Sequence, residues 1–371
     1  MSQPMEAVKQ FPLDGVAVDA KPYGCGHIND TYCVCCEREG KPQRRYILQR
    51  INRHVFKNVP QLMENMSNVT AFCRRQVIAA GGDPERECLT LIPTLDGANY
   101  FQDPDGDYWR MFIFIENAIT FQTVGKPEHF YYSGCAFGKF QRLLADYPSE
   151  TLYETIPHFH DTASRYRDFE QAVAENRSGR AGEVEEEIAF VRARKADTSV
   201  LVDMLARGEL PLRVTHNDTK LNNVMLDDVT GKAVCVIDLD TVMPGLSLYD
   251  FGDSIRFGSN PVAEDEKDLS KVYCDLDLFE QYTKGFLEEC GDMLTPAEVR
   301  MLAFSAKLMT LECGMRFLAD HIAGDTYFKI HREGHNLDRC RTQFKLVADM
   351  ESKMDQMNAI VAKYSPKMKE S

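Results

Sequence analysis

The first third of the chain alternates short apolar runs with polar turns rich in Gly, Asp and Pro. The strand-like segments are residues 18–36, which fold back on themselves, and residues 45–51, 89–93 and 109–116. Runs of this length between such turns predict β-strands. Residues 59–81 instead carry apolar side chains three or four positions apart, which predicts a helix packed on one face. Residues 1–116 are therefore predicted to form a small β-rich lobe with one main helix.

After residue 116 the helical period dominates. The predicted helices cover residues 129–147, 159–177, 184–207, 265–289, 296–321 and 338–364. Two short apolar runs, residues 224–226 and 233–237, flank a polar turn and predict a β-hairpin within the helical part. The expected fold class is α+β with two lobes, of which residues 117–371 form the larger, mainly helical one.

Composition narrows the class of protein. The chain has 371 residues, enough for about two domains. Its formal net charge of −14 argues against general nucleic-acid binding, which needs a basic surface. No apolar stretch approaches the length of a membrane span, and the first residues lack the apolar core of a signal peptide. The twelve cysteines lack zinc-site spacing and are expected to be small buried side chains in a reducing cytoplasm.

The candidate chemistry lies around the predicted hairpin. Asp218 is followed five residues later by Asn223, just before the first apolar run, and Asp238 ends the second run. Phosphoryl transfer needs a carboxylate to hold the attacking hydroxyl and oxygen ligands to hold Mg²⁺ on the phosphates. Asp218 fits the first role, and Asn223 and Asp238 fit the second. The layout predicts a bilobal, protein-kinase-like fold that uses ATP and Mg²⁺.

Asp and Asn are also common turn formers, so the sequence around Asp218 taken alone is compatible with a plain loop. The spacing, the hairpin and the terminal Asp238 together favour catalysis. His216 is expected to hold the loop, because the Asp takes the proton in this arrangement. Asp250 is expected to support the loop from the following helix.

Two glycines in the first predicted hairpin add a candidate phosphate site. Gly24 and Gly26 would let backbone N–H groups approach phosphate oxygens without a Cβ in the way. Glycines in a hairpin more often serve the turn alone, and the position of this pair in the first hairpin of a kinase-like small lobe favours the phosphate role. The chain has no Gly-x4-Gly-Lys-Ser/Thr motif, which disfavours a P-loop enzyme.

The motifs His216-x-Asp218-x4-Asn223 and Ile237-Asp238-x-Asp240 resemble those of the aminoglycoside phosphotransferase and choline kinase superfamily. Within it, the chain is similar to the N-acetylhexosamine 1-kinases along nearly its whole length. The segments that carry this similarity are residues 24–32, 48–56, 81–85, 137–146, 240–256 and 312–318. The resemblance implies ATP-dependent phosphorylation of the anomeric hydroxyl of N-acetylglucosamine or N-acetylgalactosamine. Composition and spacing do not identify the sugar.

The resemblance also suggests residues for the ligands. Asn29 is expected on the nucleotide side, and Phe114 and Glu116 are expected beside the adenine. Arg316 and Tyr327 are expected on the sugar side. Because Arg316 lies on an otherwise apolar helix, it needs a partner, which is either the sugar, the transferred phosphate or a buried salt bridge.

Asp240 keeps three roles open: support of the metal ligands, a second metal ligand, or a sugar contact. One position departs from the kinase-like pattern, which has a Lys on the third strand. Gln49 stands about there and Arg50 follows it. Neighbours on a strand face opposite sides, so one of the two at most faces the nucleotide phosphates. Glu64 is either the helix residue that pairs with the cationic side chain of the third strand or an exposed glutamate.

Two other functions are weighed against a sugar 1-kinase. The same fold could phosphorylate choline, an aminoglycoside or homoserine. A choline site needs an aromatic cage, and the lone Trp109 lies on the strand that enters the interlobe link, which disfavours choline. A non-catalytic kinase-like binding protein is supported by the missing strand lysine alone. The preferred sugar, the product anomer and the oligomeric state are left open.

Overall fold

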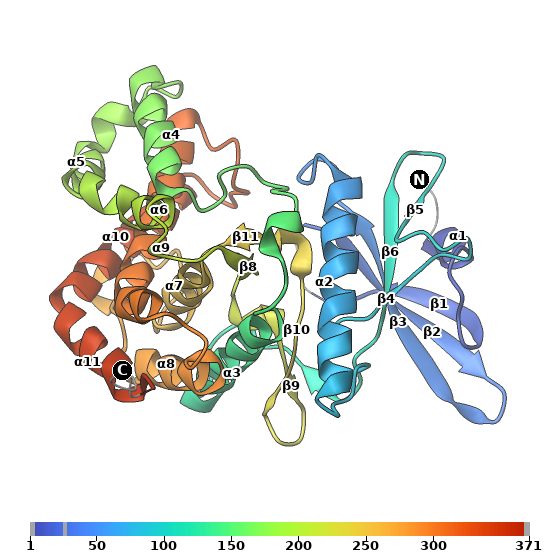
Figure 1. Ribbon diagram of the computed structural model, residues 1–371. Coiled ribbons are helices and arrows are strands. Elements are labelled where there is room, and N and C mark those ends of the chain that lie inside the picture. The colour runs from blue at the N-terminus through green and yellow to red at the C-terminus, as the bar shows by residue number, and fades with distance from the viewer. Residues whose placement is uncertain (1–3, 25–27, 367–371) are drawn as a thin grey trace.

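The computed structural model describes residues 4–24 and 28–366. Its small lobe is an antiparallel sheet with the strand order β1-β2-β3-β6-β4, and β5 pairs with the far part of β6. The strands are β1 (Val16–Pro22), β2 (Asp30–Arg38), β3 (Lys41–Ile51), β4 (Leu91–Ile92), β5 (Phe101–Gln102) and β6 (Tyr108–Ile113). The short helix α1 (Pro4–Val8) packs against β1, and α2 (Val59–Ala79) lies between the sheet and the helical lobe (Figure 1).

The buried apolar face of the helix α2 connects the two lobes. Its side chains Leu62, Met66, Val69 and Val77 are buried in a core cluster that also contains Phe112 of the sheet and many residues of the large lobe. The helix starts where the sequence indicates: the Asn58 side chain accepts the backbone N–H of Gln61, which satisfies one free donor of the first turn.

The large lobe is helical apart from three short strand pairs. Its helices are α3 (Pro127–Leu143), α4 (Thr162–Glu175), α5 (Glu185–Ala193), α6 (Val200–Ala206), α7 (Ser247–Gly258), α8 (Leu276–Cys290), α9 (Pro296–Ala323), α10 (His335–Ser352) and α11 (Met354–Tyr364). The buried helix α9 packs against α4, α7, α10 and α11. The close approach of α7 requires a glycine, because a Cβ on Gly252 would lie 2.5 Å from the carbonyl oxygen of Ser305.

The strand pairs of the large lobe carry the candidate site. They are β8 (Arg213–Thr215) with β11 (Met243–Gly245), and β9 (Val224–Asp227) with both β10 (Ala233–Val236) and β7 (Ala118–Ile119). The β9–β10 pair is the hairpin predicted from the sequence. Since β7 already pairs with β9, the chain crosses between the lobes just before it, and the boundary proposed at residue 116 falls in this crossing.

The mixed α+β architecture was predicted correctly, and some boundaries were not. The helix predicted for residues 184–207 is interrupted by a 3-10 turn (Lys195–Ser199), where the Thr198 hydroxyl donates to the carbonyl of Lys195 at 2.7 Å and competes with the helical ladder. The helix predicted from residue 265 begins at Leu276, where Asp275 caps it. Among the residues that the structure describes, no helix combines the length and apolarity needed to cross a membrane.

Candidate active site

The loop of residues 216–223, called here the Asp218 loop, connects β8 to β9 and is held from within by His216. The buried imidazole accepts the backbone N–H of Asp218 at Nδ1 (3.3 Å) and faces the carbonyl oxygen of Ile237 with Nε2 (2.9 Å). Nδ1 accepts and Nε2 donates, so both nitrogens are occupied within the fold. This geometry agrees with the predicted holding role of His216.

Two carboxylates of α7 support the same loop from below. The buried Asp250 accepts the backbone N–H groups of His216 (2.9 Å) and Asn217 (2.8 Å). Asp253 accepts the backbone N–H of Thr219 (3.0 Å) and forms an ion pair with Arg256 (2.9 Å). The supporting role expected for Asp250 is therefore confirmed.

The partly exposed carboxylate of Asp218 projects from this loop and has two close partners. The Lys220 ammonium lies 2.8 Å from Oδ1, and the Asn223 amide nitrogen lies 3.1 Å from Oδ2. The Asp218 carboxylate raises the pKa of Lys220, so this lysine is positively charged beside it. Because the Asn223 nitrogen is directed at Asp218, its amide oxygen is the end that would meet a cation.

Asp238 follows β10 in an unusual backbone conformation. Its φ and ψ are both 61°, a left-handed region that Asp tolerates better than most residues and that is frequent at functional sites. The hairpin brings it close to Asn223, because the backbone N–H of Ile237 donates to the carbonyl of Asn223 at 2.9 Å. Protein groups packed around its carboxylate, and then the charges of Asp240 and Asp218, raise the pKa of Asp238 to about 7, although the residue keeps an exposed surface.

The donors around Asp238 fit a magnesium nucleotide. Three carboxylates gathered near one another, those of Asp218, Asp238 and Asp240, favour a divalent cation, which would keep Asp238 ionised. Among residues 4–24 and 28–366, no group of three or more His, Cys, Asp or Glu is arranged to hold a metal by itself. Magnesium does not need such a group, because it is commonly held by one or two carboxylates together with substrate phosphates. Asn223 and Asp238 are the residues that would hold it here.

Asp240 does not share a strand face with Asp238, because the strand β10 ends at Val236, before both residues. Asp240 instead lies in a 3-10 turn (Leu239–Thr241), is almost completely buried, and contacts the small lobe. Its Oδ2 accepts the amide of Asn29 at 2.6 Å, and its carboxylate pairs with Arg110.

The first hairpin is partly described. Gly24 has φ +79°, with open space around the position of a Cβ, which suits a glycine turn. Gly26 lies outside the described residues. Asn29 directs its side chain at Asp240 and accepts the backbone N–H of Asn52 at 3.0 Å, so it links the hairpin to both the sheet and the large lobe.

Gln49 and Arg50 face opposite sides of the sheet, as the strand period requires. Gln49 lies toward the large lobe, where its Oε1 accepts from Arg110 at 2.8 and 3.0 Å. Arg50 pairs on the other side with Asp30 and with Asp107 (3.1 Å). Of the two, Gln49 therefore shares a face with Asp240. Glu64 is an exposed residue of α2.

Phe114 and Glu116 lie at the end of β6, where the chain leaves the small lobe. The Phe114 ring is buried beneath the guanidinium of Arg45, 3.9 Å from the ring centroid, and Tyr23 meets it edge-on at 5.5 Å. Glu116 pairs with the same arginine. The two residues expected beside the adenine are thus joined through Arg45.

Arg316 has the salt-bridge partner considered for it and also contacts aromatic rings. It lies 3.6 Å from the carboxylate of Glu312, one turn earlier on α9, and its guanidinium lies over the rings of Phe159, Tyr327 and Phe328. Tyr327 is mostly exposed. The Glu312 carboxylate also contacts Nδ1 of the buried His160 at 3.0 Å.

His160 connects Arg316 and its partner Glu312 to the Asp218 loop. Nε2 of His160 lies 3.2 Å from the backbone carbonyl oxygen of Asn217, the residue before Asp218. A chain of contacts thus connects Arg316 to the backbone just before Asp218, and no sequence pattern indicated this connection. Lys220, Arg110 and His160 are the site residues that were missed. A charged residue inside the apolar strand of residues 108–113 was the available signal for Arg110.

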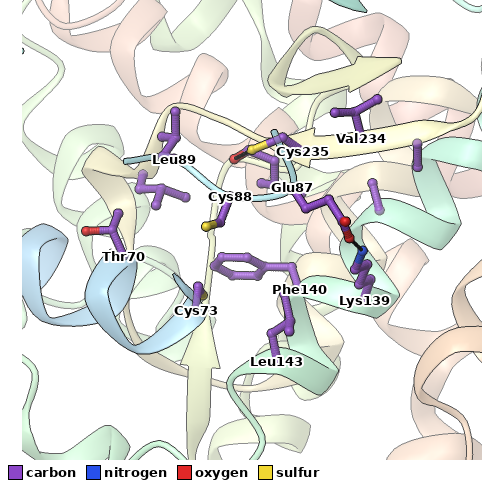
Figure 2. Close-up of a pocket in the computed structure, with 14 residues that line it drawn as sticks. Thr70, Cys73, Glu87, Cys88, Leu89, Lys139, Phe140, Leu143, Val234 and Cys235 are labelled. Atoms are coloured by element: carbon purple, nitrogen blue, oxygen red, sulfur yellow. Dashed lines mark hydrogen bonds and ion pairs between the residues drawn. The ribbon is translucent and has the colours of Figure 1, made fainter. Parts of the chain in front are cut away.

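A cavity lies beside the β9–β10 hairpin, between α2, α3 and β10 (Figure 2). It is lined mainly by apolar groups and by the thiols of Cys73, Cys88 and Cys235, and the ion pair between Lys139 and Glu87 lies at its edge. Burial raises the pKa of Cys73 to about 12 and that of Cys88 to about 11, so these thiols are protonated. They act as small apolar side chains, as the sequence suggested, and the candidate catalytic residues are elsewhere.

Three solved structures share this fold across almost the whole chain. A microcompartment-associated aminopropanol kinase is 17% identical, with 95% of this chain and 97% of that chain covered and a TM-score of 0.60. An aminoglycoside phosphotransferase from Alicyclobacillus acidocaldarius is 13% identical, with 98% and 96% covered and a TM-score of 0.58. An amicoumacin kinase in complex with AMP-PNP, Ca²⁺ and Ami is 13% identical, with 92% of each chain covered and a TM-score of 0.57.

Sequence comparison gives the family. A model described as the phosphotransferase enzyme family matches residues 19–283, which include the first hairpin, the Asp218 loop, Asp238 and α7. The matched region covers well over half of the 371 residues, and the chain therefore belongs to the phosphotransferase enzyme family.

Proposed function

We propose that this phosphotransferase transfers the γ-phosphoryl group of ATP to the anomeric C1 hydroxyl of N-acetylglucosamine or N-acetylgalactosamine. The observation that carries the kinase part is the grouping of Asp218, Asn223 and Asp238 around one hairpin. The structural relative bound to AMP-PNP and Ca²⁺ supports a nucleotide with a divalent cation as the donor. Magnesium at Asn223 and Asp238 would neutralise charge on the phosphates.

The proposed roles follow from the contacts. Asp218 orients the C1 hydroxyl and takes its proton while the hydroxyl oxygen bonds to the γ-phosphorus and the bond to the β-phosphate oxygen breaks. Lys220 keeps a positive charge 2.8 Å from the Asp218 carboxylate and fixes its direction. His216 and Asp250 hold the loop, so that little motion is needed when the reaction occurs.

Two arginines connected to the Asp218 loop offer hydrogen-bond donors to a polar acceptor. Arg316 is close enough to Arg165 that, after burial, it is the next largest influence lowering the pKa of Arg165. Each arginine also faces a carboxylate, Glu312 for Arg316 and Asp168 for Arg165, so their charges are partly balanced. A polar, uncharged sugar can accept hydrogen bonds from guanidinium groups, which donate and do not accept. This supports the sugar assignment that the sequence resemblance suggests.

The test is a coupled ADP-release assay over free sugars, choline, amino alcohols and aminoglycosides. The acetamido group should matter, because a site built to bond a polar group rejects analogues that leave its partners unpaired. We expect a higher kcat/KM for N-acetylglucosamine or N-acetylgalactosamine than for glucose and galactose. Phosphorus coupling to the anomeric carbon in NMR should identify a 1-phosphate.

Each other outcome has a definite meaning. A product phosphorylated at C6, or a preference for choline or an aminoglycoside, contradicts the acceptor and leaves the kinase intact. Tight nucleotide binding without transfer to any member of the panel would favour the non-catalytic alternative.

A further inference from the structure

A group of four side chains, two of them buried, joins the lobes close to Asp238. Arg110 on β6 is 1% exposed and Asp240 is 4% exposed, and the two form an ion pair across the lobe boundary. Gln49 on β3 faces Arg110 across the strands, where the two residues are register partners. Asn29, from the first hairpin, donates to Asp240 at 2.6 Å. We call these four residues the interlobe unit.

The guanidinium of Arg110 is fully occupied inside the unit. Nε donates to Gln49 Oε1 at 3.0 Å, and Nη2 donates to Gln49 Oε1 at 2.8 Å and to Asp240 Oδ2 at 3.0 Å. Nη1 donates to Asp240 Oδ1 and approaches the sulfur of Met66 at 3.5 Å. A guanidinium has five N–H groups, and each has an acceptor here. Arg110 is therefore built to hold protein groups in place and not to bind phosphate.

The interlobe unit lies where protein kinases have a different ion pair. In protein kinases an ion pair between a strand lysine and a helix glutamate must form for activity. Here Gln49 stands on the strand, and Glu64 of α2 is exposed to solvent. The α2 side chains that meet Arg110 are instead the thioethers of Met63 and Met66. The negative partner comes from the large lobe, two residues after Asp238.

We propose that Arg110 and Asp240 are positioning residues that set the Asp238 carboxylate and the first hairpin in one fixed relation. Asp240 receives Arg110 from the sheet and Asn29 from the hairpin, so its place fixes the short turn that begins at the left-handed Asp238. Gln49 also holds Arg110 in place, because its neutral amide oxygen accepts two N–H groups of the guanidinium, which a lysine at this position would repel. The inference rests on the proposed magnesium–nucleotide role of Asp238.

The test separates positioning from simple structural support. Arg110→Met and Asp240→Asn should each lower kcat about 10- to 100-fold, the usual effect of removing a group that orients metal ligands. The same variants should lose a similar factor in the gain of nucleotide affinity that Mg²⁺ provides, measured by calorimetry with AMP-PNP in Mg²⁺ and in EDTA. Affinity in EDTA should change less, because the donors of Arg110 and the carboxylate of Asp240 are occupied by protein groups.

Two further variants make the result decisive. The double variant Arg110→Met with Asp240→Asn removes the isolated buried charge left by either single change, so the melting temperature should return toward that of the wild type. Its kcat and its Mg²⁺ effect should remain low. Arg44→Met removes an arginine of the same strand β3 whose partner, Glu85, is on the surface, and it should change neither quantity by more than about twofold.

Recovery of kcat in the double variant would show that the unit is only structural and would overturn the proposal. Equal Mg²⁺ effects in the wild type and in both single variants would overturn it as well. The calorimetry does not depend on the acceptor. If the wild type phosphorylates no acceptor, the proposed function fails while the Mg²⁺ comparison still decides the role of Arg110 and Asp240.

Discussion

Asp218 and Lys220 form an ion pair within one loop, and the loop itself is fixed by neutral or buried groups. The bonds of His216 and Asp250 go to backbone atoms, so they determine where the Asp218 carboxylate points without changing its charge. Lys220 supplies the local positive charge. At the scale of single residues, orientation and electrostatics are thus assigned to different side chains.

Replacing Asp218 by Asn tests the proton acceptor. The amide has the same shape and can keep the contact with Asn223, but it cannot accept a proton from the hydroxyl at neutral pH. We expect kcat to fall about 10²-fold or more, the usual scale of general-base catalysis, while nucleotide affinity is retained. Steady-state kinetics and calorimetry check this. Wild-type turnover in a folded Asp218→Asn enzyme would remove Asp218 from the mechanism.

His160 provides a pH-dependent prediction. Its ring nitrogens face two acceptors, the carboxylate of Glu312 and the carbonyl of Asn217, so the imidazolium form satisfies both bonds. Burial alone would lower the pKa of His160, but the charge and hydrogen bond of Glu312, together with the charge of Asp253, outweigh burial and raise it. A raised pKa in the folded state contributes stability that is full below the unfolded value of about 6.5 and is lost as pH rises through the folded pKa.

The measurement is urea unfolding between about pH 5.5 and pH 9 for the wild type and for His160→Asn. The difference in the free energy of unfolding between the two proteins should be largest at the acidic end and shrink as pH rises. The variant also serves as the control for the other histidines, which both proteins share. A difference that does not change with pH would show that His160 is neutral in the folded protein.

The sequence predicted which candidate residues lie together where their contacts are local. Asp218 and Asn223 are five positions apart and Asp238 follows the same hairpin, so spacing alone was informative. Arg110 and Asp240 are 130 residues apart in the sequence, and His160 and Glu312 are 152 residues apart. No periodicity connects such pairs, because tertiary packing creates them.

At the scale of elements, the helix α9 shows how a local signal and a distant contact coincide. Thr295 and Glu298 form a capping box, which the sequence Thr-Pro-Ala-Glu encodes directly. The same Glu298 carboxylate accepts from Arg213 of β8 at 2.6 Å and from the Ser247 hydroxyl at the start of α7 at 2.7 Å. One buried side chain therefore fixes the starts of α7 and α9 against the strand that precedes the Asp218 loop.

Replacing Glu298 by Ala should be strongly destabilising. It leaves the guanidinium of Arg213 without its carboxylate in a mostly buried place, which costs about 3 kcal/mol of the free energy of unfolding. Urea unfolding should show a lower midpoint with an unchanged slope. As a matched control, Glu6→Ala on α1 removes an exposed glutamate 2.7 Å from the exposed Lys9 and should cost less than about 1 kcal/mol. Equal losses for the two variants would contradict this role of Glu298.

The elements were predicted more reliably than their ends. Apolar periodicity located α2, α9 and the β9–β10 hairpin, because each buries one regular face or a short apolar run. It failed at residues 195–199, where side-chain bonds to the backbone replace the helical ladder without changing the apolar pattern. It also failed at the start of α8, where the cap of Asp275 determines the first turn.

For the whole molecule, the decisive feature is that one core continues through both lobes. The cluster that contains α2 and Phe112 of the small lobe also contains α7, α8 and α9 side chains of the large lobe. The interlobe unit adds a polar connection at the same boundary. We therefore expect the lobes to unfold together, so that a ligand bound between them stabilises the complete chain.

Magnesium and a non-hydrolysable ATP analogue test this expectation. A ligand that binds only the folded state, at a concentration of 100 times its Kd, stabilises that state by about 2.7 kcal/mol. AMP-PNP with Mg²⁺ should therefore raise the melting temperature of the single calorimetric transition by several degrees. EDTA should reverse the part that depends on Mg²⁺. Asp238→Asn, chosen because Asn tolerates the left-handed backbone, should lose that part and nearly all transfer activity. A full Mg²⁺ effect in this variant would move the metal away from Asp238, and two separate transitions would show that the lobes do not share one cooperative core.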